Sequence, residues 1–125
     1  LGLSSLIEFK GFVENPFPYY KNALFTVLSS KNEGFPNVLI ETLATQTPVI
    51  AFDCFSGPNE IIEHEHNGLL VENQNFEAFT KSMNRMIEDQ NLYNNCKQNA
   101  KKSVRKFDVE IIGQQWRNLF KNVVS

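Results

Sequence analysis

The feature that most constrains the fold is the stretch 29–41, in which an apolar segment gives way to a polar loop and then to a helix. The apolar run 24–28 is typical of a strand. Pro36 suits the first position of a helix, because its missing N–H would have no partner there. The stretch therefore predicts a strand–loop–helix unit. Glu33 lies in its loop and Glu41 roughly one and a half turns into its helix.

This helix is amphipathic. At about 100° per residue its apolar residues share one broad face, which we predict to be the core face. Its members are Pro36, Leu39, Ile40, Leu43 and Ala44. Glu41 lies well off this face, on the same edge as Asn37 one turn earlier. At the rise of an α-helix, Glu41 is roughly 7.5 Å along the axis from the helix start.

The start of this helix has the properties of an anion site. Its first N–H groups lack intrahelical partners and the helix dipole is positive there, which favours phosphate. One ligand can place a phosphate on the amides near Asn37 and Val38, offer a diol to Glu41, and reach Glu33 beyond the phosphate. A nucleotide has that shape. The alternative that remains open is that Glu41 is a solvated helix residue and Glu33 an ordinary loop acid.

The composition is that of one globular domain. The 125 residues are 42% hydrophobic and 21% charged, which suits a modest single core. A net charge of −2 gives no electrostatic reason to expect nucleic-acid binding. Cys54 and Cys96 have neither CxxC nor metal-ligand spacing, which indicates reduced thiols in a cytoplasmic protein. We find no signal peptide and no apolar run long enough to span a membrane.

Strands and helices alternate up to residue 71. The predicted strands are 6–10, 24–28, 47–52 and 69–71, and the predicted helices between them are 19–23, the one from about Pro36, and 59–63. The run 47–52 is almost continuously apolar, which is typical of a parallel strand buried on both faces. This order predicts right-handed crossovers and an α/β fold, a Rossmann-like parallel sheet flanked by helices.

The carboxyl ends of parallel strands meet at one edge of a sheet, where open α/β sheets bind ligands. The loops that follow the predicted strands contain Gly11, Glu33, Ser56–Gly57 and Glu72–Asn73. We therefore expect these loops to lie together. After them, apolar residues spaced by three and four predict a helical tail, with stripes at 76–86, 92–107 and 111–123 that serve packing.

The chain also contains short motifs that are specific when taken together. Glu33 and Glu41 are separated by seven residues. Around them, in order, stand Gly11-Phe12, Tyr19-Tyr20, Ala23, Pro48–Ala51, Ser56–Ile62 and Asn67–Val71. This set resembles the retaining glycosyltransferases of family four, the glycosyl transferases group 1, which have the two-domain GT-B architecture and a paired-glutamate motif. The resemblance covers nearly the whole chain and places residues 1–125 in the C-terminal portion of the nucleotide-sugar (donor)-binding domain.

The resemblance implies transfer of a sugar from a nucleotide-sugar to an acceptor hydroxyl, with retention of anomeric configuration and without a metal. It implies that Glu41 accepts hydrogen bonds from the two ribose hydroxyls of the nucleotide. Glu33 becomes the catalytic residue, which binds the donor sugar and steadies positive charge at its anomeric carbon. The backbone amides across 35–39 hold sugar and diphosphate. The donor-binding residues it implies are Gly11, Gly34, Phe35, Pro36, Asn37, Val38, Leu39, Glu41, Ser56 and Gly57.

The resemblance also implies substrates and partners. The donor is a nucleotide-sugar, a UDP-sugar in the commonest case, and it is a substrate rather than a cofactor. The acceptor is a glycan or a lipid-linked glycan, as in bacterial polysaccharide or lipopolysaccharide biosynthesis. The family's N-terminal acceptor domain is absent from these residues, as are the first two strand–helix units of its donor domain, the first of which carries a basic pair. The open alternatives are a glycosyltransferase fragment, a non-catalytic binding domain that meets a complementary chain, and an inactive remnant.

Two polar segments carry weaker signals. The segment 63–66 alternates glutamate and histidine, but two histidines two residues apart do not share a helix face, and we predict no metal site there. The basic run 101–106 is typical of a solvated helix face. An alternative that stays open is peripheral contact with an anionic membrane at the inner face of the plasma membrane.

Overall fold

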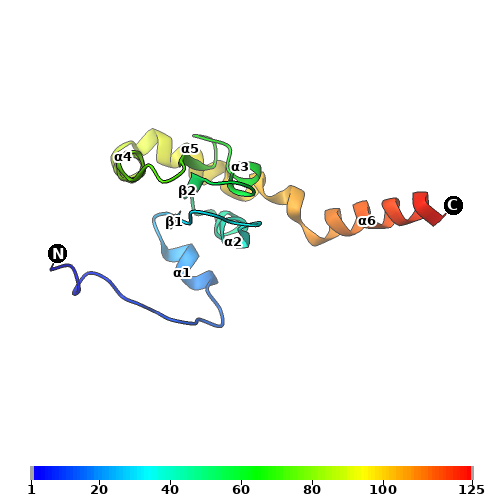
Figure 1. Cartoon of the computed structure of the whole chain (residues 1–125), viewed down its shortest axis with the longest axis horizontal. Coiled ribbons are helices and arrows are strands. Elements are labelled where there is room, and N and C mark those ends of the chain that lie inside the picture. Colours follow the sequence, from blue (N-terminus) through cyan, green and yellow to red (C-terminus); the bar gives the residue numbers. More distant parts are fainter. Residues whose placement is uncertain (1, 125) are drawn as a thin grey trace.

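Three parallel strands form the sheet in this computed structural model, which describes residues 2–124. The strands are β1 (Thr26–Leu28), β2 (Val49–Asp53) and β3 (Gly68–Glu72), in the order β1-β2-β3. The helices are α1 (Phe17–Asn22), α2 (Asn37–Ala44), α3 (Pro58–Ile61), α4 (Phe76–Glu88), α5 (Gln90–Ser103), the 3-10 helix η1 (Arg105–Phe107) and α6 (Val109–Val124). The predicted parallel α/β sheet with a helical tail is confirmed (Figure 1).

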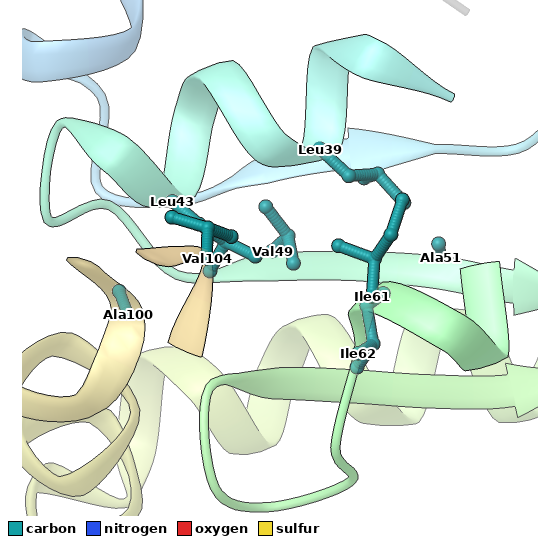
Figure 2. Packing of buried hydrophobic residues seen from close by; sticks show 8 residues of the cluster. All are labelled: Leu39, Leu43, Val49, Ala51, Ile61, Ile62, Ala100 and Val104. Carbon is teal, nitrogen blue, oxygen red and sulfur yellow. The ribbon is translucent and has the colours of Figure 1, made fainter. Parts of the chain in front are cut away.

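Strand β2 is the centre of the core, since helices cover both of its faces. Val49 and Ala51 belong to a buried cluster with residues of α2, α3 and α5 (Figure 2). Ile50 and Phe52 point to the opposite face, into a cluster with residues of β3, α4 and α5. This pattern explains the unbroken apolar run in the sequence, because a strand covered on both faces has no solvent side.

The two cysteines are both free thiols in buried positions. Cys96 lies in the second cluster, on α5, and its burial raises the pKa of the thiol to about 11. The thiol therefore remains neutral near pH 7 and behaves as a small apolar side chain.

The predicted strand 6–10 is wrong. The structure has no strand at these residues, and the side chains of Leu6 and Phe9 are 80% and 93% exposed. The segment 2–15 runs apart from the sheet (Figure 1). A strand is stabilised by ladder hydrogen bonds to a neighbour, and no strand within residues 2–124 lies beside this segment to supply them.

Two predictions about α2, its start and its core face, need correction. The helix begins one residue after Pro36, because Pro36 has a ψ of 87°, outside the helical region, and is the N-cap. Ala44 is exposed, whereas Thr42 is buried. The Oγ1 atom of Thr42 has no hydrogen-bond partner among the described residues. Leu39 and Leu43 are fully buried as predicted.

Helix α6 projects away from the sheet (Figure 1). Its apolar side chains form an exposed face. Trp116 is 55% exposed and stacks on Phe120 with 5.7 Å between ring centroids. None of the described residues of α6 is buried. Within residues 2–124, no helix combines the length and apolar character needed to cross a bilayer.

Gly68 permits the close pairing of β2 with β3 and gives a test of the fold. A Cβ atom at Gly68 would lie 2.3 Å from the carbonyl oxygen of Val49, its partner in the strand register. We expect Gly68→Ala to lower the free energy of unfolding by about 1–3 kcal/mol in urea titrations, because backbone would have to move. Gly113→Ala, where no atom lies closer than 3.9 Å, is the control and should not lower it. Equal stability of the two variants would contradict the close pairing.

Candidate functional site

The loops that follow the three strands meet at one edge of the sheet, as predicted. The loop after β2 is tied to the loop after β1 by Ser56, whose Oγ donates to the carbonyl oxygen of Gly34 at 2.9 Å. The loop after β3 is tied to the same loop by Asn73, whose Nδ2 donates to the carbonyl oxygen of Lys31 at 3.2 Å. The stretch around Glu33 is therefore held from two sides.

Gly57 packs against this loop so closely that no other residue fits. A Cβ atom there would lie 2.5 Å from Cδ of Pro36 and 3.0 Å from the carbonyl oxygen of Gly34. Gly57 also has a φ of 98°, which favours glycine, and the preceding Ser56 has a φ of 72°. Ser56 and Gly57, predicted to border the donor pocket, thus act first as supports of the Gly34–Pro36 turn.

The start of α2 has no side-chain cap. Its N-cap residue is Pro36, which cannot donate or cap, and no acidic residue stands in the first turn. The amide of Leu39 donates to the carbonyl oxygen of Pro36 at 3.0 Å, but among the described residues the amides of Asn37 and Val38 have no partner. Two N–H groups at the positive end of the helix dipole thus remain for an anion.

Glu41 is half-buried on α2 and has a partner that the sequence does not reveal. The phenol of Tyr20, on α1, donates to Oε2 of Glu41 at 3.3 Å. Burial raises the pKa of Tyr20, and the negative charge of Glu41 raises it further. The phenol therefore stays protonated at neutral pH and acts as a donor.

Glu33 is half-buried in the loop after β1, two residues beyond the carbonyl that Asn73 holds. No ion pair to Glu33 exists among residues 2–124. Its carboxylate therefore has no charged partner there, and hydrogen bonds to the backbone hold the loop that carries it. That is a suitable arrangement for a group that meets positive charge on a ligand.

Two predicted donor-binding residues have side chains committed elsewhere. The ring of Phe35 packs edge-to-face on Phe107 of η1, with 5.6 Å between centroids, while 42% of the residue stays exposed. The side chain of Leu39 is fully buried in the core and its amide is already used. Gly11 lies in the segment 2–15, which runs apart from the sheet (Figure 1), so the structure does not bring it to the other loops.

A hollow of about 430 Å³ lies elsewhere, along α3 and α5. It is lined by charges of both signs, including Glu60 and Lys102, and by no residue of the loop after β1. Lys106, from the basic run, donates to the carbonyl oxygen of Glu60 at 3.0 Å beside it. His64 of the alternating segment accepts a hydrogen bond at Nδ1 from the amide of Leu70 at 3.1 Å. These residues therefore have structural contacts of their own.

Sequence reasoning missed three contacts of the site: Tyr20 with Glu41, Asn73 with Lys31, and Phe107 with Phe35. The first joins residues 21 apart and the second residues 42 apart. Local periodicity carries no information on such pairs. Only the convergence of the loops after β1 and β3 pointed towards Asn73.

The chain matches the family model described as glycosyl transferases group 1 over residues 1–103. It is 33% identical over 126 aligned residues to an exopolysaccharide phosphotransferase of Streptomyces coelicolor, covering 100% of this chain and 13% of that protein. It is 36% identical over 108 residues to an N-acetylgalactosaminyltransferase of Campylobacter jejuni whose name specifies a diphospho-undecaprenol-linked acceptor. That match covers 86% of this chain and 30% of the relative.

Among solved structures, the chain is similar to Anabaena HepE in complex with UDP, with a TM-score of 0.90 and 26% identity. The match covers 97% of this chain and 34% of that protein. The chain therefore spans about a third or less of the length of the relatives named here.

The contact of Gly57 with the Gly34–Pro36 turn can be tested directly. We expect Gly57→Ala to lower the free energy of unfolding by about 1–3 kcal/mol, because alanine is strained at this φ and its Cβ meets Pro36. Amide chemical shifts across 34–38 should move as well. Gly34→Ala, in the same turn but with open space at its Cβ, is the matched control and should change stability by less than about 0.5 kcal/mol. Unmoved amide shifts in Gly57→Ala would contradict the support role.

Proposed function

The chain belongs to the glycosyl transferases group 1, and from this premise we propose that its loop cluster binds the nucleotide-sugar donor of a retaining glycosyltransferase. One observation carries the proposal: Glu33 and Glu41 stand on either side of the uncapped start of α2, at the carboxyl ends of parallel strands. Open α/β sheets bind their ligands at this edge. The cluster thus joins an anion-binding helix end to two carboxylates.

Glu41 is the residue that binds the ribose. A carboxylate offers about four acceptor positions on its two oxygens, so Glu41 can accept two ribose hydroxyls while Tyr20 occupies one position on Oε2. Hydrogen bonds to a charged group are worth about 1.5–3 kcal/mol each. A half-buried carboxylate with this geometry selects a cis-diol over a ligand that lacks it.

The diphosphate lies at the start of α2. The amides of Asn37 and Val38 donate to its oxygens, and the helix dipole adds a partial positive charge. Gly34, which has open space at its Cβ, lets a ligand approach the backbone of the loop. The full negative charge of a diphosphate exceeds what two amides balance, and in the family the basic pair of the first strand–helix unit of the donor domain supplies the remainder.

Glu33 is the catalytic residue of the proposal. It binds hydroxyls of the donor sugar and stabilises the positive charge that develops at the anomeric carbon as the bond to the diphosphate breaks. The oxygen of the acceptor hydroxyl bonds to the anomeric carbon on the same face, its proton passes to the departing diphosphate oxygen, and the anomeric configuration is retained. The carboxylate of Glu33 has no ion-pair partner among residues 2–124, and hydrogen bonds to the neighbouring backbone hold its loop, which supports this role.

The relatives suggest the substrates. The Anabaena structure holds UDP and the Campylobacter enzyme is named for an undecaprenol-linked glycan, so we propose a UDP-sugar donor and a glycan or lipid-linked acceptor in polysaccharide or lipopolysaccharide biosynthesis. The Streptomyces relative matches over only 13% of its length, so the phosphotransferase activity of its name is not assigned to the matched part. A cytoplasmic location, with peripheral contact at the inner membrane face, belongs to the same proposal.

The acceptor substrate is bound by protein outside these residues. The exposed apolar face of α6, around Trp116 and Phe120, suits docking on the acceptor-binding domain or on a complementary chain. This face favours the alternative in which residues 1–125 bind the donor but catalyse nothing without that partner. Coexpression with the missing half of a relative separates the glycosyltransferase fragment and the partner-dependent domain from an inactive remnant, because the remnant alone gains no transfer activity.

Thermal unfolding with UDP, GDP, ADP and their sugars tests donor binding. A ligand that binds only the folded chain adds about 2.7 kcal/mol to the free energy of unfolding when its concentration is 100 times its Kd. This raises the midpoint of thermal unfolding measurably. We expect one base to raise the midpoint of the wild-type chain and to leave that of Glu41→Ala unchanged. Glu88→Ala, an exposed carboxylate at the end of α4, is the control and should respond like wild type. A wild-type chain that folds but responds to no nucleotide would overturn the proposal for these residues.

The division of labour between the two glutamates is a separate prediction. Glu41→Ala should weaken nucleotide affinity roughly 10- to 100-fold, the loss of a charge-assisted hydrogen bond or more. Glu33→Ala should leave the Kd of the nucleoside diphosphate within about twofold and instead reduce turnover by roughly 100-fold once the acceptor domain is supplied. Calorimetric titration with UDP gives the first quantity and single-turnover sugar transfer the second. Equal losses of UDP affinity in both variants would contradict these roles.

A further inference from the structure

We propose that Tyr20 is a positioning residue for Glu41, which holds the carboxylate in the orientation that ribose binding requires. The inference rests on the proposed function, since it gives Glu41 the ribose hydroxyls. Tyr20 comes from α1, which precedes β1 in the chain, and Glu41 from α2, which follows β1. The two helices are in contact. The phenol donates to Oε2 of Glu41 at 3.3 Å.

Tyr20 is itself held at both ends. Its backbone carbonyl accepts a hydrogen bond at 2.8 Å from Oγ1 of Thr47, a buried residue that precedes β2. Its ring packs edge-to-face on Phe17, with 6.0 Å between centroids. The phenol is therefore presented from a fixed backbone and a supported ring, and it does not have to be ordered when a ligand arrives.

Glu41 needs such a partner because a glutamate on a helix surface has several rotamers. No other hydrogen bond or ion pair to its carboxylate exists within residues 2–124. Tyr20 selects one orientation before ligand binds, and ordering in advance lowers the entropy lost on binding. The phenol uses Oε2 and leaves acceptor positions on both oxygens for the two hydroxyls of a ribose.

The chain supplies a matched control in the neighbouring residue. Tyr19 is 47% exposed, on the same helix, and no hydrogen bond from its phenol exists among the described residues. Its ring lies 5.4 Å from Nζ of Lys10, a contact that phenylalanine retains. Tyr19→Phe and Tyr20→Phe therefore remove the same hydroxyl from adjacent positions, only one of which reaches Glu41.

The test compares UDP with 2′,3′-dideoxy-UDP, which lacks both ribose hydroxyls. We expect Tyr20→Phe to weaken UDP binding roughly two- to tenfold, the effect of one hydrogen bond, and to leave the Kd of the dideoxy compound unchanged. Tyr19→Phe should change neither. In a Glu41→Gln background, Tyr20→Phe should cause no further loss of UDP affinity beyond that of Glu41→Gln alone, because the residue acts through the carboxylate.

Each other outcome overturns something specific. Equal losses for UDP and the dideoxy compound would mean that Tyr20 supports the domain in general and does not position Glu41. UDP affinity of Tyr20→Phe equal to that of wild type would overturn the inference while the proposed function stands. Absence of UDP binding by the wild-type chain, with its fold confirmed by circular dichroism, is failure of the proposed uridine donor site, and the role of Tyr20 falls with it.

Discussion

The burial of β2 on both faces is the constraint on which the remaining structure depends. Val49 and Ala51 fill one core cluster, and Ile50 and Phe52 fill the other. Because β2 also pairs with a strand on each edge, its register fixes where all three strand-end loops begin. The fully buried side chains and the close pairing of Val49 with Gly68 make any slip of this strand costly. The position of the candidate site is thus set by the core and not by the loops themselves.

The loops add a second level of order, because they are tied to one another without a ligand. The side chains of Ser56 and Asn73 donate hydrogen bonds to backbone carbonyl oxygens of the loop after β1. Gly57 packs on Pro36 at the end of the same loop. Ser56 and Gly57 both have positive φ, a conformation that costs free energy for a residue such as serine. These contacts hold the backbone of the loop and the start of α2 in place without a ligand, which is the arrangement of a preorganised site.

Sequence reasoning recovered what is periodic or local and missed what is not. The buried run of β2, the helix with Glu41, and the stripes of α4 and α5 all have a period that neighbouring residues reveal. The exposure of Ala44 and burial of Thr42 were missed, because the predicted face was drawn through the apolar residues alone and the observed buried face includes a polar one. The contacts of Tyr20 with Glu41 and of Phe35 with Phe107 depend on how α1 and η1 pack, and no local pattern encodes that.

The open edge of β1 gives one explanation for the failed strand 6–10 and for the incomplete charge balance of the site. In the doubly wound order 3-2-1-4-5-6, strands four, five and six are neighbours, as β1, β2 and β3 are. The segment 6–10 would then be the third strand, separated from β1 by strands one and two, which these 125 residues do not contain. In the family, the first of those strand–helix units carries the basic pair for the diphosphate. Two such strand–helix units would offer ladder partners to 6–10 and to β1, and cations to the proposed ligand. Residues 1–125 joined to two such units should form the strand 6–10 and bind the proposed nucleotide more tightly together.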